Sequence, residues 1–263
     1  MVVDGVSLHN ALTALGADGL WCVAALDFEL GYLLEPAAAP AAWAPPANRP
    51  LARFWRFCQR IAMDAVEAEA WLVAQGAAQP AGVGGLSAGI DEKRHAGAVD
   101  RIRDYIAAGD CYQVNFTFPL SFEWFGNPVA LYAGLRAMQP VRYGGFMGDA
   151  GEGIVSLSPE LFLEKNGERL VTRPMKGTLA RDQSAERLRE SLKDRAENLM
   201  IVDLLRNDLG RVAASGSVQV EQLFAVEDYP TVWQMVSEVS ARVPGVSLAE
   251  ILQALFPCGS ITG

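Results

Sequence analysis

The sequence predicts an α+β fold built around large, mostly antiparallel sheets. Strand-like and helix-like segments follow one another in mixed order, without the regular strand–helix alternation that builds a parallel sheet. Asn166-Gly167, between the strand-like runs 161–165 and 168–172, is a strong signal for the two-residue turn of a hairpin, which joins antiparallel strands. The chain has 263 residues, of which 51% are hydrophobic, so it is long and apolar enough to bury a core.

Residues 1–90 are expected to form the N-terminal part of the fold, and residues 91–263 the region that carries its function. One or two strands are predicted over 20–34. Residues 36–50 are mostly alanine and proline, which cannot sustain a helix or a central strand, so they are expected to form an excursion on the surface. The Gly/Ala-rich segment 76–90 is expected to be a loop.

Three elements are predicted next. Apolar residues at helical spacing between Val99 and Ile106 predict a helix that ends at Gly109. Residues 112–120 alternate between apolar and amide side chains, which predicts an amphipathic strand. Asn127, followed by proline, is typical of the residue that caps the start of a helix.

A long helix is predicted over 185–206, because apolar residues recur there at helical spacing. The side chains expected on its buried face are Leu188, Leu192, Leu199 and Met200.

The remaining segments contain strands and one more helix. Strands are predicted over 153–157 and, two or three in number, between 217 and 243. Ser247 with Glu250 forms a capping box that predicts a last helix, and 257–263 is expected to be a turn-rich tail.

Charge and cysteine content exclude several classes of protein. Twenty-two basic and thirty-one acidic residues give a net charge of −9, so the chain has no general attraction for nucleic acid or for an anionic membrane. No run of about twenty apolar residues predicts a membrane span, and the first residues lack the features of a signal peptide. The four cysteines are widely spaced, which favours reduced thiols over a zinc site. We therefore expect a soluble protein of the cytoplasm.

Chemistry in this chain is expected to depend on carboxylates, lysine, amides and backbone groups, because it has only two histidines. Lys176 precedes Gly177 and Thr178, whose backbone amides can receive an anion. Glu160 lies in a turn between two predicted strands, and it comes near Lys176 if those strands pair. A solvated lysine in a turn is the commoner alternative.

Two further groups of residues are candidates for binding. Asp194 and Glu197 are three positions apart on the predicted helix and share a face. They form either a solvated acidic face or a site for Mg²⁺, which takes one or two carboxylates and keeps water and substrate oxygens. Residues 259–263 offer hydroxyls and small residues that let an anion approach the backbone, a weak signal by itself.

Together, five segments resemble the chorismate-utilising enzymes, and within them the sequence is most similar to the aminodeoxychorismate synthase component I family. The segments are 109–115, 158–160, 173–178, 196–209 and 259–263. The resemblance implies sheets packed as a sandwich with helices on the outside. It also implies amination of chorismate at C4, with ammonia from a glutamine amidotransferase subunit, for para-aminobenzoate and folate synthesis.

The resemblance also implies roles for single residues. Lys176 matches a nucleophile that attacks C2 of the ring, and Glu160 matches the general acid that protonates the departing C4 hydroxyl. Glu197 matches a Mg²⁺ ligand, with Asp194 as a second candidate. The implied substrate-binding positions are Gly177, Thr178, Gln113, Gly259, Ser260, Thr262 and Gly263. Gln113 stands where isochorismate and salicylate synthases carry a lysine that activates water, so an amide there argues against water as the nucleophile.

Two alternatives stay open. Anthranilate synthase component I shares the fold and the substrate, but it aminates at C2; that family has alanine at the position of Lys176 and histidine at the position of Gln234. Members of both families extend beyond both ends of this chain, which therefore resembles a chain truncated at both ends. A non-catalytic remnant is the second alternative.

Overall fold

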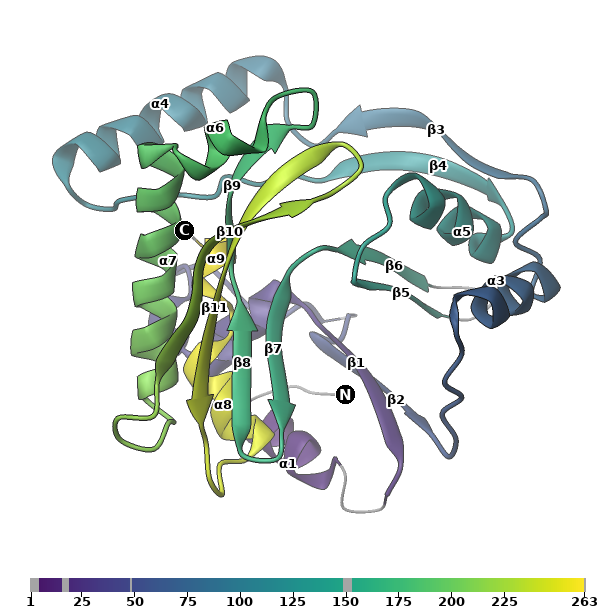
Figure 1. Cartoon of the computed structure of the whole chain (residues 1–263), viewed down its shortest axis with the longest axis horizontal. Coiled ribbons are helices and arrows are strands. Elements are labelled where there is room, and N and C mark those ends of the chain that lie inside the picture. Colours follow the sequence, from purple (N-terminus) through teal and green to yellow (C-terminus); the bar gives the residue numbers. More distant parts are fainter. Residues whose placement is uncertain (1–4, 16–18, 48, 149–152, 263) are drawn as a thin grey trace.

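The computed structural model describes residues 5–15, 19–47, 49–148 and 153–262, and its strands pair antiparallel throughout these ranges (Figure 1). The largest sheet has five strands, in the order β10 (Gln219–Asp228), β11 (Val232–Arg242), β8 (Arg169–Arg173) and β7 (Leu161–Asn166), with β9 (Met175–Ala180) also paired to β11. Three two-stranded sheets pair β1 (Trp21–Leu26) with β2 (Ala52–Phe57), β3 (Ala81–Ala88) with β4 (Leu120–Gly126), and β5 (Tyr143–Gly148) with β6 (Gly153–Ser158). The predicted α+β class is confirmed.

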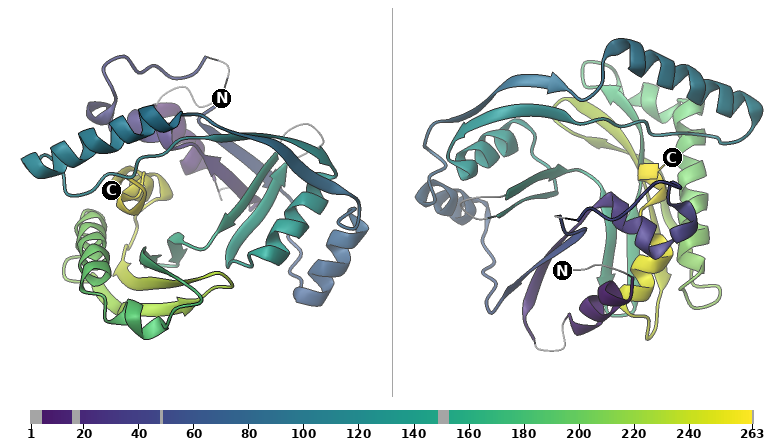
Figure 2. Two further views of the ribbon diagram at one scale, coloured as in Figure 1. Left: turned by 90° about the horizontal axis from the view of Figure 1, so that it is seen from above. Right: turned by 180° about the vertical axis from the view of Figure 1, so that it is seen from behind.

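Helices accompany every sheet (Figure 2). They are α1 (Gly5–Ala14), α2 (Gly31–Leu34), α3 (Ala65–Ala74), α4 (Glu92–Ala108), α5 (Pro128–Met138), α6 (Ala185–Arg189), α7 (Leu192–Gly210), α8 (Leu248–Leu255) and α9 (Gly259–Thr262). Within the described ranges, none of them combines the length and the apolar composition that a membrane crossing needs.

The main core lies where α7 and α8 cover the five-stranded sheet. Val202 and Leu209 of α7 and Val239 of β11 are completely buried there. A second cluster joins Leu8 of α1 to Leu252 of α8, so the N-terminal segment shares a core with the C-terminal helix. Burial of these side chains holds the strand ends in place beneath the site described below.

Local signals placed several elements correctly. Helix α4 ends at Gly109, which adopts the left-handed conformation (φ 82°) that favours glycine. The side chain of Asn127 accepts a hydrogen bond from the Val129 N–H at the start of α5. The hairpin between β7 and β8 is present, but its two turn residues are Gly167 and Glu168, one position later than predicted, because Asn166 still pairs with Arg169. The Ser247 capping box begins α8.

Two expectations for the N-terminal region were wrong. Only the first part of 20–34 is a strand; a short 3-10 turn (Phe28–Leu30) and helix α2 replace the rest. In this helix, Gly31 lies close to Pro257: a Cβ atom on Gly31 would come within 2.6 Å of the proline ring. Residues 81–88 are not loop but strand β3, because β4 supplies backbone partners for this glycine-rich segment. The excursion over 36–50 is confirmed as mostly exposed.

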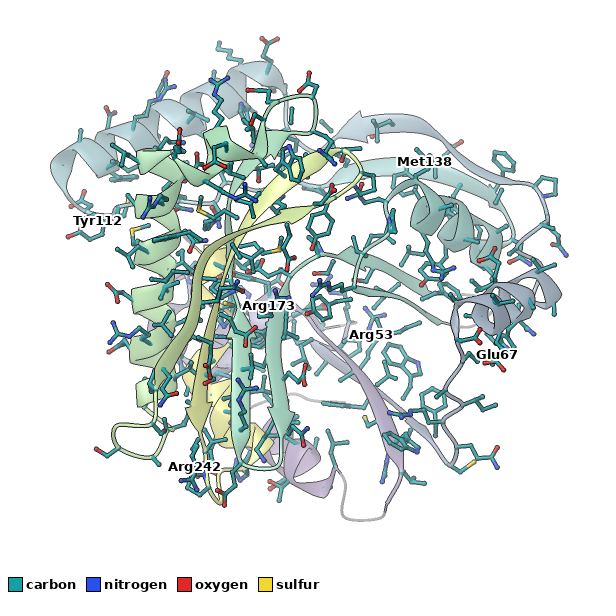
Figure 3. The ribbon with its side chains drawn as sticks, viewed as in Figure 1. Arg53, Glu67, Tyr112, Met138, Arg173 and Arg242 are labelled. Carbon is teal, nitrogen blue, oxygen red and sulfur yellow. The ribbon has the colours of Figure 1, made fainter. Side chains whose placement is uncertain are left out.

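The strand predicted over 112–120 does not form; regular pairing begins only at Leu120. Its alternating pattern has a different cause. Phe116 and Phe118 pack on the ring of His95 from α4, while Asn115 binds backbone carbonyls near the end of the chain. Tyr112 is 89% exposed and lies at the outer edge of the molecule (Figure 3).

The long helix predicted over 185–206 is two helices, α6 and α7, and the second extends to Gly210. Ser191 separates them, and its side chain caps the start of α7. Because of the break, α7 does not continue the face of α6 that carries Leu188, and Leu192 and Leu199 are exposed instead of buried. Leu188 is buried as predicted. The residues of α7 that are buried are Asn198, Ile201, Val202, Leu205 and Leu209.

Candidate active site

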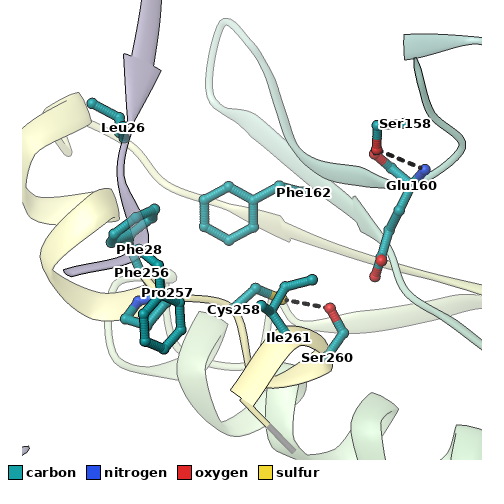
Figure 4. A pocket seen from close by; sticks show the side chains of 10 residues that line it. All are labelled: Leu26, Phe28, Ser158, Glu160, Phe162, Phe256, Pro257, Cys258, Ser260 and Ile261. Atoms are coloured by element: carbon teal, nitrogen blue, oxygen red, sulfur yellow. Dashed lines mark hydrogen bonds between the residues drawn. The ribbon is translucent and has the colours of Figure 1, made fainter. Parts of the chain in front are cut away.

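Glu160 projects into a cavity of about 290 Å³ from the turn between β6 and β7 (Figure 4). The cavity is lined by Leu26, Phe28, Ser158, Glu160, Phe162, Phe256, Pro257, Cys258, Ser260 and Ile261. The turn that carries Glu160 is held by Ser158, whose side-chain oxygen accepts a hydrogen bond from the Glu160 N–H at 3.3 Å. A carboxyl group is therefore fixed among mainly apolar walls.

The surroundings of Glu160 favour its protonated form. Burial raises the pKa of this carboxyl above its ordinary value. Hydrogen bonds from the Ser260 hydroxyl and the Met175 N–H, together with the positive charge of Lys176, oppose the rise without cancelling it. A carboxyl that keeps its proton at higher pH is suited to general acid chemistry.

Lys176 lies on β9, close enough to Glu160 for its charge to act on that carboxyl. The sheet explains the proximity. Pairing of Leu161 with Arg173 aligns the start of β7 with the end of β8, and the chain then passes directly through Met175 to Lys176. The structure thus brings together the two residues that the sequence singles out; their roles stay predictions.

Arg173 is the first residue of the segment 173–178 and the last residue of β8, and its side chain pairs with residues of two other strands. Its guanidinium pairs with Glu227 of β10 at 2.7 Å and with Glu238 of β11 at 3.2 Å, and its side chain is only 15% exposed. These ion pairs tie three strands together below the site.

Position 177 requires glycine for two reasons, its backbone conformation and the close approach of its neighbours. Its φ of 99° is a conformation that other residues rarely adopt, and a Cβ atom would lie 3.0 Å from the Cβ of Asp194. The close approach places Asp194 of α7 beside β9. On the following residue, the Thr178 hydroxyl donates to the side-chain oxygen of Gln234 at 2.9 Å.

Asp194 and Glu197 extend from the first turns of α7. Asp194 accepts a hydrogen bond from the Ser191 hydroxyl, and Glu197 pairs with Lys193 at 3.3 Å. Among the described residues, no group of three or more His, Cys, Asp or Glu side chains could hold a metal ion. Mg²⁺ takes one or two carboxylates and fills its other positions with water or ligand oxygens, so a Mg²⁺ site at this pair stays a prediction.

Asn198, which the sequence did not single out, connects this helix to the lysine. The side chain is completely buried. Its amide donates to the backbone carbonyls of Lys176 at 3.2 Å and Met235 at 3.3 Å, and its oxygen accepts from the Ser237 hydroxyl at 2.5 Å. A buried amide with all these partners fixes the backbone of β9 against α7. The pattern offered no signal, because a single asparagine in a helix usually faces solvent.

Replacing Asn198 with alanine is expected to lower the free energy of unfolding by about 1–3 kcal/mol, because two carbonyls and a hydroxyl lose their partner in the core. Chemical denaturation measures the change. Asn207→Ala, on the exposed side of the same helix, is the control and should change stability little. Equal effects of the two substitutions would contradict the structural role of Asn198.

The C-terminal segment is held by Asn115, a second residue that the sequence did not single out. Its side-chain amide donates to the carbonyls of Ser260 at 3.0 Å and Ile261 at 2.8 Å, and its oxygen accepts from the amide of Gln113 at 3.1 Å. Residues 259–262, expected to be turns, form the short helix α9.

The residues predicted in this tail do not share one cavity. Ser260 lines the cavity of Glu160, whereas Thr262 lines a neighbouring cavity of about 410 Å³. Gly259 packs so closely that a Cβ atom would come within 2.1 Å of the Leu204 side chain, which would have to shift to admit a larger residue. Gly263 lies outside the described residues.

Comparison with known proteins gives a consistent result. Residues 2–263 match the family model of the chorismate binding enzyme. The chain is 42% identical over 171 residues to aminodeoxychorismate synthase component 1 of Salmonella typhimurium, covering 62% of this chain and 38% of that relative. It is 40% identical over 187 residues to anthranilate synthase component 1 of Thermus thermophilus, covering 68% of this chain and 40% of the relative.

A solved structure agrees with the sequence matches. Anthranilate synthase component I from Streptococcus pneumoniae superposes with a TM-score of 0.75 at 25% identity, covering 93% of this chain and 62% of that chain. The matched relatives are thus considerably longer than the chain described here. Because the family model spans almost every residue, the chain belongs to the chorismate binding enzyme family.

Proposed function

We propose that this chain acts as the component I of an aminodeoxychorismate synthase, which aminates chorismate at C4 to 4-amino-4-deoxychorismate for para-aminobenzoate and folate synthesis. The observation that carries the proposal is the placement of Lys176 beside the buried carboxyl of Glu160. A nucleophile and an acid in one site can form a bond to the ring and release a hydroxyl from it in the same step.

The proposed reaction has two steps. The neutral amine of Lys176 attacks C2 of chorismate, both ring double bonds shift by one position toward C4, and the C4–oxygen bond breaks. Glu160 gives its proton to the departing hydroxyl, which leaves as water. Ammonia then bonds to C4, both ring double bonds shift back, and the C2–nitrogen bond breaks to release Lys176. The raised pKa of Glu160 supports its role, because an acid must still hold its proton when substrate binds.

Asp194 and Glu197 are the residues that would hold Mg²⁺ in this proposal. Bound there, Mg²⁺ supplies positive charge to a substrate carboxylate, which a chain of net charge −9 otherwise has little means to attract. Gly177 supports the assignment, because its lack of a side chain brings the backbone of β9 directly against Asp194.

The proposed partner is a glutamine amidotransferase subunit that supplies the ammonia. The name "component 1" of the Salmonella typhimurium relative supports a partner, since it implies a second component. We place the reaction in the cytoplasm; the four cysteines support this, because all are free thiols, as in a reducing compartment.

Anthranilate synthesis is the second candidate, since the identity to the Thermus thermophilus relative is nearly as high. That reaction aminates chorismate at C2. Lys176 favours the first candidate, because the resemblance places alanine at this position in anthranilate synthases. Gln234, which binds the Thr178 hydroxyl here, stands where they carry histidine.

The test mixes the purified chain with chorismate, ammonium chloride and Mg²⁺, and identifies the products by mass spectrometry. Formation of 4-amino-4-deoxychorismate that requires Mg²⁺ supports the proposal, and anthranilate supports the second candidate. The absence of any product, under conditions in which a full-length relative turns over, would overturn the proposed activity for this chain.

A further inference from the structure

The hydroxyl of Ser260 lies between the thiol of Cys258 and the carboxyl of Glu160. The sulfur of Cys258 and the Ser260 Oγ are 3.2 Å apart, and the Ser260 hydroxyl hydrogen-bonds the Glu160 carboxyl. Figure 4 shows the carboxyl pointing toward Ser260 across the cavity. Ser260 is only 5% exposed and Cys258 only 8%, so both groups are inside the wall of the site.

Ser260 is held in this place by contacts on both sides of it. The side chain of Asn115 binds the backbone carbonyl of Ser260 and that of Ile261. On the other side, Gly259 packs directly against the side chain of Leu204 of α7. The hydroxyl therefore reaches Glu160 from a fixed backbone.

The chemistry of the three groups gives the hydrogen bonds a direction. An ionised carboxylate only accepts, so Ser260 donates its proton to Glu160 and its oxygen remains free to accept one. Cys258 can supply that proton, because burial raises the pKa of its thiol, while hydrogen bonds from the side chain and backbone N–H of Ser260 oppose the rise without cancelling it. Either of the two atoms, Cys258 Sγ or Ser260 Oγ, can donate, and donation by the thiol is the direction compatible with a Ser260 proton on Glu160. The thiol donates to the hydroxyl, and the hydroxyl donates to the carboxyl.

The same direction holds when Glu160 is protonated. A carboxylic acid still accepts through its carbonyl oxygen, which Ser260 occupies, and the acid proton is then on the other oxygen. This arrangement leaves the proton free to face the cavity.

We propose that Ser260 and Cys258 are positioning residues, a donor chain that orients the Glu160 carboxyl so that its proton faces the substrate. Ser260 thereby acts on the reaction through Glu160 instead of binding the substrate. The benefit to catalysis rests on the proposed function, whereas the donor chain itself is a property of the folded protein.

The test is a titration of Glu160 that needs no activity. Carbon-13 label in the glutamate carboxyls gives NMR signals, and loss of one signal in Glu160→Gln assigns it. In Ser260→Ala the midpoint of Glu160 should rise by about one pH unit, because the ionised form loses a donor. Cys258→Ala should raise it less, and Ser260→Thr, which keeps a hydroxyl, should restore the original midpoint. Lys176 is the facing charge and is unchanged in all these variants.

Matched controls are Ser87→Ala and Cys22→Ala, which remove a serine and a cysteine that do not line the cavity. Neither should move the midpoint. An unchanged midpoint in Ser260→Ala would overturn the proposal, as would equal shifts in the controls. The S–H stretch in the infrared is a second readout: the band lost in Cys258→Ala should move to higher frequency in Ser260→Ala, and an unmoved band contradicts donation by the thiol.

Activity separates positioning from substrate binding. If Ser260 positions the acid, Ser260→Ala moves the alkaline limb of the pH–rate profile upward with the NMR midpoint and lowers kcat. An increase in KM with an unmoved profile would assign Ser260 to substrate binding and overturn the proposal. If no variant forms product, the proposed function fails, while the NMR and infrared measurements still decide the donor chain.

Discussion

Replacing Lys176 with alanine is expected to abolish amination of chorismate at C4, by about 10³-fold or more, or to redirect it to C2. The variant has no amine to attack C2, so the covalent route is lost, and it carries the residue that the resemblance assigns to anthranilate synthases. Product analysis by mass spectrometry separates the two outcomes. Without ammonia, the wild-type chain should also gain the mass of chorismate less one water, and the variant should not.

Lys165→Ala is the control for this substitution. Lys165 lies on strand β7, is exposed, and its amine donates to the Gly167 carbonyl in the hairpin at 2.8 Å. Its loss should leave product formation unchanged. Unchanged formation of 4-amino-4-deoxychorismate in Lys176→Ala would remove the basis for choosing this reaction over anthranilate synthesis.

Replacing Glu160 with glutamine is expected to lower the rate of amination by about 10²–10⁴-fold, because an amide does not act as a general acid. In the wild-type chain, the rate should fall as pH rises through the pKa of Glu160, which burial places above its ordinary value. The variant should lose this limb of the pH–rate profile. Glu164→Gln, an exposed position on β7, is the control and should keep both the rate and the limb.

The same substitution should make the fold more stable at neutral pH. Since the folded-state pKa of Glu160 is raised, its stabilising contribution is complete below the unfolded-state pKa and is lost as pH rises through the folded-state pKa. Glutamine has no charged form to bury, so Glu160→Gln loses this dependence. Denaturation at several pH values measures the difference; a variant less stable than wild type at neutral pH would contradict the burial of this carboxyl.

The sequence predicted those parts of the fold that depend on neighbours along the chain. The β7–β8 hairpin, the Gly109 cap and the Ser247 capping box are fixed by a few adjacent residues, and all are present, with the hairpin turn one residue later than predicted. Strand β3, which was not predicted, and the irregular conformation of 112–119, which was predicted to be a strand, both depend on segments far away in sequence. No local pattern reports that β4 pairs with a glycine-rich segment, or that an asparagine binds the end of the chain.

The candidate site shows the same division. Lys176 and Glu160 were predicted as site residues because their motifs are compact, and the sheet places the two side chains near each other. The residues that support them were missed: Asn198 lies on a helix and Asn115 in an irregular segment, and each acts on backbone groups far away in sequence. Supporting side chains are chosen by three-dimensional packing, so one sequence does not identify them. The boundary at residue 90 between the N-terminal part and the functional region stays a prediction.

Helix α7 connects the two parts of the candidate site, the strand that carries Lys176 and the carboxylates Asp194 and Glu197. Asn198 hydrogen-bonds this helix to the carbonyl of Lys176, while Asp194 stands one turn earlier and Glu197 immediately before it. A displacement of α7 is therefore expected to move the Lys176 backbone together with both carboxylates. If the proposed Mg²⁺ binds these carboxylates and steadies the helix, thermodynamic linkage would make it steady Lys176 as well, and a ligand bound at Lys176 would raise the affinity for the cation in return.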